Sequence, residues 1–99
     1  MEVKIQSIHF DASEQLQSFI RKKAVKLERF YDDITKVEVS LKVVKPETAA
    51  NKEAGVKVTV PNAEFYANKV CDTFEEAVDI SLEALEKQLV KYKEKLRNK

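Results

Sequence analysis

Apolar residues in the last quarter of the chain recur every three or four positions. That spacing places one apolar stripe along a helix of roughly seven turns between residues 72 and 99. Its members are Phe74, Val78, Leu82, Leu85, Leu89, Tyr92 and Leu96. We expect Leu85 and Leu89 to be buried against a sheet.

An earlier stretch, from about residue 13 to residue 31, has the same spacing and predicts another helix. Asp11 and Ser13 stand before it as candidate N-caps, and Glu14 favours the first turn. The expected apolar face consists of Leu16, Phe19, Ile20, Ala24, Leu27, Phe30 and Tyr31.

Four shorter segments alternate between apolar and polar residues and predict strands. They are residues 3–10, 34–44, 55–60 and 64–70. In the first, the alternation shifts by one position near Ser7, which implies a bulge or the end of the strand. Residues 45–54 are polar, include Pro46 and lack any apolar pattern, so we expect a mobile loop there.

The resulting order is β-α-β-β-β-α. A strand, a helix and a second strand form a right-handed crossover, which makes the first two strands parallel, and the remaining strands add as an antiparallel meander. Because each central strand alternates, only one sheet face is apolar, and both helices must cover it. The sequence predicts an α+β two-layer sandwich, with a four-stranded sheet and two helices on one face, as a single domain over residues 1–99.

Charges are segregated along the last predicted helix. Residues 72–86 contain six acids and no base, whereas residues 87–99 contain six bases and one acid. The helix macrodipole favours such a bias only within the first and last turn. Lys87, Lys91 and Lys95 lie four positions apart, so they form a row away from the apolar stripe.

The first helix is also basic, with a row at Lys22, Lys26 and Arg29. Lys23 lies nearer the apolar margin, where its stem can pack while its ammonium reaches water. With both helices on one sheet face, we expect the two basic rows to lie side by side. Charge runs are often just solvated faces. Segregation from acids favours phosphate contacts instead. The candidate RNA-binding residues are Lys22, Lys23, Lys26, Arg29, Lys87, Lys91 and Lys95.

Residues suited to catalysis are scarce. The single glycine excludes glycine-rich phosphate loops, and one histidine with one cysteine cannot form a usual zinc site. Glu75, Asp79 and Glu83 share a helical face that could hold a cation, but a solvated face favoured by the dipole is the simpler interpretation. We therefore predict no enzyme, no catalytic residue, no metal, no cofactor and no small-molecule substrate. A catalytic role for His9 is the remote alternative.

Other features of the sequence bear on the cellular location of the protein and on the kind of RNA that it binds. No run of about 18 apolar residues exists, so we expect no membrane span. A single cysteine and the lack of a signal peptide fit a reducing cytoplasm. Tyr66 is the one aromatic residue placed for base stacking, on the outer sheet face. Stacking on single strands is therefore disfavoured, and structured RNA is the expected target.

The whole chain resembles the short ribosome hibernation promoting factors and their relatives, the ribosome-associated translation inhibitors once called sigma-54 modulation proteins. The segments that carry the resemblance are KLERF (26–30), LKV (41–43), DTF (72–74) and LEKQLVKYKEKL (85–96). The resemblance implies a fold similar to double-stranded-RNA-binding domains. It also implies binding to the small ribosomal subunit, in the channel used by messenger and transfer RNA.

The resemblance also assigns residues. Lys23, Lys26 and Arg29 match the basic positions of the family's first helix, and Lys87 and Lys91 match those of the second. At Ala84 relatives often carry another lysine, so that contact is missing or is supplied by Lys22 or Lys95. A C-terminal dimerisation domain is not expected.

Two functions follow as expectations. The first is a cytoplasmic, bacterial stress-response protein, monomeric off the ribosome, that binds ribosomal RNA and inhibits translation by occupying the messenger and transfer RNA sites. The alternative is a protein-interaction module that binds an acidic partner such as a transcription factor.

Overall fold

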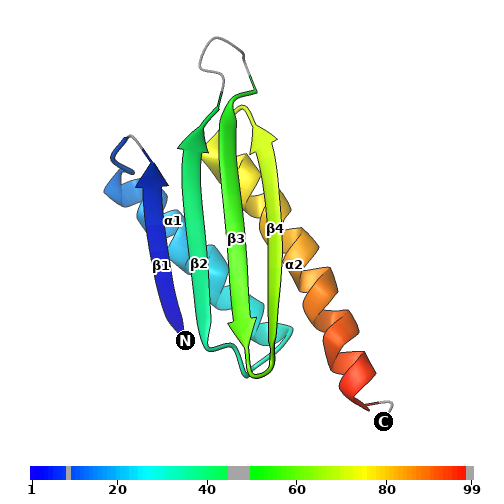
Figure 1. Cartoon of the computed structure of the whole chain (residues 1–99). Helices are drawn as coiled ribbons and strands as arrows, with labels where there is room; N and C mark the ends of the chain where they lie inside the picture. The colour runs from blue at the N-terminus through cyan, green and yellow to red at the C-terminus, as the bar shows by residue number, and fades with distance from the viewer. Residues whose placement is uncertain (9, 45–49, 98–99) are drawn as a thin grey trace.

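The computed structural model describes residues 1–8, 10–44 and 50–97. Its elements are β1 (Glu2–Ile8), α1 (Glu14–Val25), the 3₁₀ turn η1 (Lys26–Arg29), β2 (Lys36–Val43), β3 (Lys52–Val60), β4 (Ala63–Cys71) and α2 (Phe74–Arg97). Figure 1 shows them as one sheet with two helices behind it. The predicted β-α-β-β-β-α order is confirmed.

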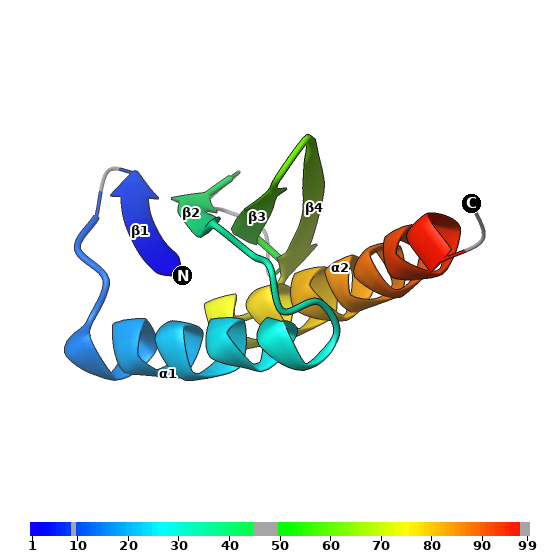
Figure 2. The ribbon, with the colours of Figure 1, turned by 90° about the horizontal axis from the view of Figure 1, so that it is seen from below.

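The sheet has the strand order β1-β2-β3-β4. β1 is parallel to β2, and the β2–β3 and β3–β4 pairs are antiparallel. Seen from below, α1 and α2 lie together on the same side of the sheet (Figure 2). The predicted crossover and two-layer sandwich are therefore confirmed.

The core lies between this sheet face and the helices. Val37, Val39 and Leu41 of β2 alternate inward and are buried, as the pattern predicted. Leu85 and Leu89 of α2 are fully buried, which confirms the predicted face of the helix. Burying one such side chain contributes about 1.5–3 kcal/mol, so these positions set the rotation of α2 about its axis.

The N-terminal strand is shorter than predicted. Its register with β2 is regular up to the Ile8–Lys42 pair, so the shift in alternation marks the end of the strand rather than a bulge. Phe10 follows the strand and stacks on Phe74 at the start of α2, with ring centroids 5.0 Å apart. Its apolar side chain therefore serves helix packing and not the strand.

The first helix also ends earlier than predicted. Ser13 caps α1 by accepting a hydrogen bond from the Leu16 backbone N–H at 3.1 Å, as expected. After Val25 the chain tightens into η1, and the backbone N–H groups of Phe30 and Tyr31 both donate to the Leu27 carbonyl. A 3₁₀ turn at a helix end satisfies these groups while turning the chain toward β2.

β3 begins inside the segment predicted as a loop. Lys52 pairs with Val43 on one side and Cys71 on the other, and Ala54 is fully buried. The inward parity continues from Val56 back to Ala54, whose small side chain gives little hydrophobic signal. Residues 45–49 of the predicted loop lie outside the described residues.

α2 continues past the sheet. The Tyr92 ring packs edge-on against Phe65, and its hydroxyl donates to the Pro61 carbonyl at 3.5 Å, beside the β3–β4 turn. Leu96, one turn later, is 44% exposed, so the apolar stripe is not covered at its C-terminal end. The reason is visible in Figure 1, where the end of α2 extends beyond that turn.

Candidate nucleic-acid interface

The C-terminal half of α2 carries a row of free cations. Lys87, Lys91 and Lys95 are exposed, and none forms an ion pair with any residue that the structure describes. Lys87 and Lys91 each follow a buried leucine by two positions, which is roughly 200° around the helix. Packing of Leu85 and Leu89 on the sheet therefore turns these lysines into solvent.

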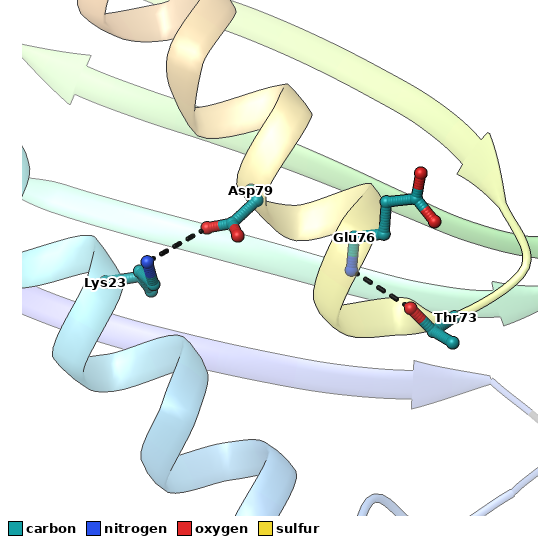
Figure 3. A network of polar contacts seen from close by, with 4 residues as sticks. All are labelled: Lys23, Thr73, Glu76 and Asp79. Atoms are coloured by element: carbon teal, nitrogen blue, oxygen red, sulfur yellow. Dashed lines mark hydrogen bonds and ion pairs between the residues drawn. The ribbon is translucent and has the colours of Figure 1, made fainter.

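On α1 and η1, Lys22, Lys26 and Arg29 are exposed, but Lys23 is partly buried. Its ammonium lies 3.3 Å from a carboxylate oxygen of Asp79 on α2, as Figure 3 shows, and 5.5 Å from the centre of the Phe19 ring. The stem packs at the apolar margin as predicted. The ammonium, however, pairs with α2, and the side chain remains only partly exposed.

The acidic half of α2 faces α1. A groove of about 730 Å³ runs between the helices, with one wall from α1 and η1 and the other from α2. The first wall consists of Phe19, Lys23 and Lys26, and the second of Glu75, Glu76, Asp79, Ile80, Leu82, Glu83 and Glu86. Glu75 and Glu83 are exposed, as expected of a solvated face, whereas Asp79 is partly buried and pairs with Lys23 across the groove.

Local interactions fix where this acidic wall begins. The Thr73 hydroxyl accepts a hydrogen bond from the Glu76 backbone N–H at 3.2 Å, which caps the first turn of α2 (Figure 3). Glu75 and Glu76 occupy that turn, where negative charge is stabilised by the macrodipole. Further along, the buried Ser81 hydroxyl donates to the Ala54 carbonyl at 3.3 Å and ties the helix to β3.

The two basic rows are not side by side, contrary to expectation. The α1 row lies beside the acidic half of α2, and the basic half of α2 extends beyond the end of α1 (Figure 2). Phe30, just after η1, lies between the two basic rows, since it lines a hollow with Lys87 and Lys91. The Lys23–Asp79 ion pair shows this stagger, since it joins the C-terminal end of α1 to the second turn of α2.

The opposite sheet face presents paired charges. Lys36 contacts Glu38 at 3.1 Å, and Lys57 contacts Glu64 at 2.9 Å. The hydrogen bond from Lys36 lowers the pKa of Glu38, and the one to Glu64 raises the pKa of Lys57. Tyr66 is 58% exposed on this face, as its strand position predicted. The face offers fewer free cations than the helices.

Groups for other chemistry are few. The described residues hold no cluster of three or more His, Cys, Asp or Glu side chains that could hold a metal ion. Burial raises the pKa of the Cys71 thiol, with Glu76 adding to the effect, so the thiol is a poor nucleophile at neutral pH. His9 lies outside the described residues. Within the described part of the chain, neither helix is long and apolar enough to cross a bilayer.

Known proteins are similar to this chain in sequence and in fold. Residues 3–97 match the family described as "Sigma 54 modulation protein / S30EA ribosomal protein". A ribosome hibernation promoting factor of Azotobacter vinelandii is 32% identical over 96% of this chain and 85% of its own length. The factor of that name from Escherichia coli (strain K12) is 30% identical over 98% of both chains.

A solved structure agrees with these sequence matches. The ribosomal subunit interface protein from Coxiella burnetii has a TM-score of 0.79 and 25% identity, covering 94% of this chain and 98% of its own. Membership also supports the prediction of a non-enzymatic protein. The resemblance found in the sequence is thus confirmed, and the chain belongs to the ribosome hibernation promoting factor (sigma-54 modulation protein) family.

Proposed function

We propose that this protein binds ribosomal RNA of the small ribosomal subunit and inhibits translation by occupying the path of messenger and transfer RNA. The observation that carries the proposal is the exposed row of Lys87, Lys91 and Lys95, which has no ion-pair partner among the described residues. Membership of the family supports the ribosome as partner. Lys22 and Lys23 of α1, with Lys26 and Arg29 of η1, extend the contact.

The geometry of α2 suits a phosphate backbone. Successive lysines of the row are separated by roughly 6 Å along the helix axis, and the helix is already folded before binding. Three ammonium groups can therefore contact phosphates together with little loss of backbone entropy. Lysine binds phosphate as a point charge and requires no fixed base sequence, so this contact supplies affinity and not sequence readout.

Occupation of the subunit, and not chemistry, is the inhibitory step in this proposal. The protein acts as a single domain, is a monomer off the ribosome, resides in the cytoplasm and needs no cofactor. Messenger and transfer RNA are then excluded because their phosphate-lined path is already filled.

Sedimentation through a sucrose gradient tests this function. The protein should migrate with small subunits at low salt and remain at the top at high salt, because phosphate contacts release counterions and weaken as salt rises. Addition of the protein to a cell-free translation reaction should lower the yield over the same salt range.

Failure to migrate with small subunits at low salt would contradict the proposal. An acidic protein partner would then be the better explanation of the basic rows. The same gradient separates single ribosomes from ribosome dimers, so it also reads out which of them the protein stabilises.

A further inference from the structure

A small apolar hollow lies within the basic surface. It has a volume of about 350 Å³ and is lined by Phe30, Glu86, Lys87, Val90 and Lys91. Val90 is 38% exposed although it belongs to a helix whose other aliphatic residues up to Leu89 are largely covered. Phe30 is partly buried, so part of its surface remains open to the hollow.

The lining combines two kinds of contact. Phe30 and Val90 provide an apolar surface, and Lys87 and Lys91 provide cations without an ion-pair partner among the described residues. Phosphate groups alone would leave the apolar surface without a matching contact. A nucleotide matches both, because its base has an apolar face and its phosphate a negative charge.

The size and the remaining side chain fit the same ligand. The hollow is at the lower end of the roughly 300–1,000 Å³ found for small-ligand sites. Glu86 lines the hollow and has no ion-pair partner within the described residues. Its carboxylate repels phosphate but accepts a hydrogen bond from the exocyclic amino group of a base. Phosphate is thereby directed to the lysines and the base edge to Glu86.

We propose that the hollow between Phe30 and Val90 takes one unstacked nucleobase of the RNA whose phosphates contact Lys87 and Lys91. This inference rests on the proposed function and deepens it. It adds contact with one base to a surface that otherwise recognises charge. The sequence had assigned Phe30 to the core, so stacking was expected only at Tyr66.

Val90→Ser tests the apolar contact on the full chain with purified small subunits. Binding should weaken about fivefold at every salt concentration, near the lower end of the effect of losing one base contact. The logarithmic salt slope should not change, since no charge is removed. Val70→Ser is the matched control, because Val70 is 37% exposed and lies on the outer sheet face. It should bind as the unaltered protein does.

Photo-crosslinking identifies what enters the hollow. With p-benzoylphenylalanine in place of Val90, irradiation of the complex should attach the protein to a nucleotide of ribosomal RNA at one position. Attachment to a ribosomal protein instead would overturn the proposal, as would equal affinity of Val90→Ser and the unaltered protein. In both of those outcomes the unaltered protein still binds subunits, whereas loss of the proposed function itself appears as no binding by any variant.

Discussion

The two halves of α2 have the same helical geometry and opposite charges, but they differ most in what lies beside them. The acidic half, with Asp79, faces the cations of α1, and its buried residues hold it on the sheet. The basic half, with Lys87 and Lys91, extends beyond α1 and forms no ion pair with any residue in the described part of the chain. The first half of the helix thus packs on the sheet beside α1, and the second half, which Leu89 and Tyr92 anchor to the fold, also presents cations without an ion-pair partner among the described residues.

The largest expected effect concerns burial at the boundary between the halves. Leu89→Ala should reduce the free energy of unfolding by about 2–5 kcal/mol, because it opens a cavity under a fully buried side chain. A domain of this size has about 5–15 kcal/mol in total. Leu96→Ala, the same change at a 44% exposed position, should cost less than about 0.5 kcal/mol. Denaturant unfolding measures both, and equal costs would show that the two positions do not differ in packing.

The next prediction concerns the free cations. If the basic rows contact about six phosphates, the logarithmic salt slope of subunit binding should be about −5, and Lys87→Ala with Lys91→Ala should flatten it by about two contacts. Stability should hardly change, since both side chains point away from the core.

Two lysines of the outer sheet face provide the control for that experiment. Lys42→Ala with Lys57→Ala removes the same charge, and Lys57 is already paired with Glu64. The slope should stay nearly unchanged. Flattening of the slope by the sheet-face pair, and not by the α2 pair, would show that RNA binds the outer sheet face and that the assignment to α2 is wrong.

A smaller effect is expected where the acidic half meets α1. Asp79→Asn removes the partner of Lys23, so the free energy of unfolding should fall by less than about 1 kcal/mol, as is usual for an exposed or half-exposed pair. Affinity for small subunits should rise, because the freed ammonium becomes available to phosphate. A double-mutant cycle with Lys23→Ala measures the coupling. Equal binding by Asp79→Asn and the unaltered protein would show that Lys23 is not available to RNA in either form.

The smallest effect is a pH dependence at Cys71, the last residue of β4. The folded-state pKa of Cys71 is raised, mainly by burial and further by Glu76. The thiol should therefore leave the free energy of unfolding constant at pH values below its pKa in the unfolded chain. The free energy of unfolding should fall as pH rises past that pKa. Alkylation of the native protein by iodoacetamide should be slow near neutral pH. Glu76→Gln should shift the alkylation profile slightly to lower pH, and an unchanged profile would show that Glu76 does not act on the thiol.

Periodicity predicted the features that depend on a single element. The spacing of Leu85 and Leu89 identified the buried face of α2, and Ser13 before Glu14 identified the cap of α1. The extent of elements was less well predicted. The stripe continues through Leu96 although the sheet ends near Tyr92, and the small side chain of Ala54 hid the start of β3.

The relation between elements was not predictable from spacing. A helical pattern shows that Glu75, Asp79 and Glu83 share a face, but it does not show which neighbouring helix that face meets or at what stagger. The one available signal was the match between a basic α1 and an acidic half of α2. The pairing of Lys57 with Glu64 likewise needed the strand register. The assignment of individual lysines to RNA stays a prediction.

The charge segregation along α2 also gives the molecule an electric dipole. The net charge is only +1, but acids and bases occupy opposite ends of a helix of 24 residues, which is roughly 36 Å long. Near a polyanion the protein should turn its basic end forward before contact, so its association rate should depend on ionic strength more than its net charge indicates. At physiological salt the screening length is about 8 Å, so the distant acids hardly oppose the approach of the basic end.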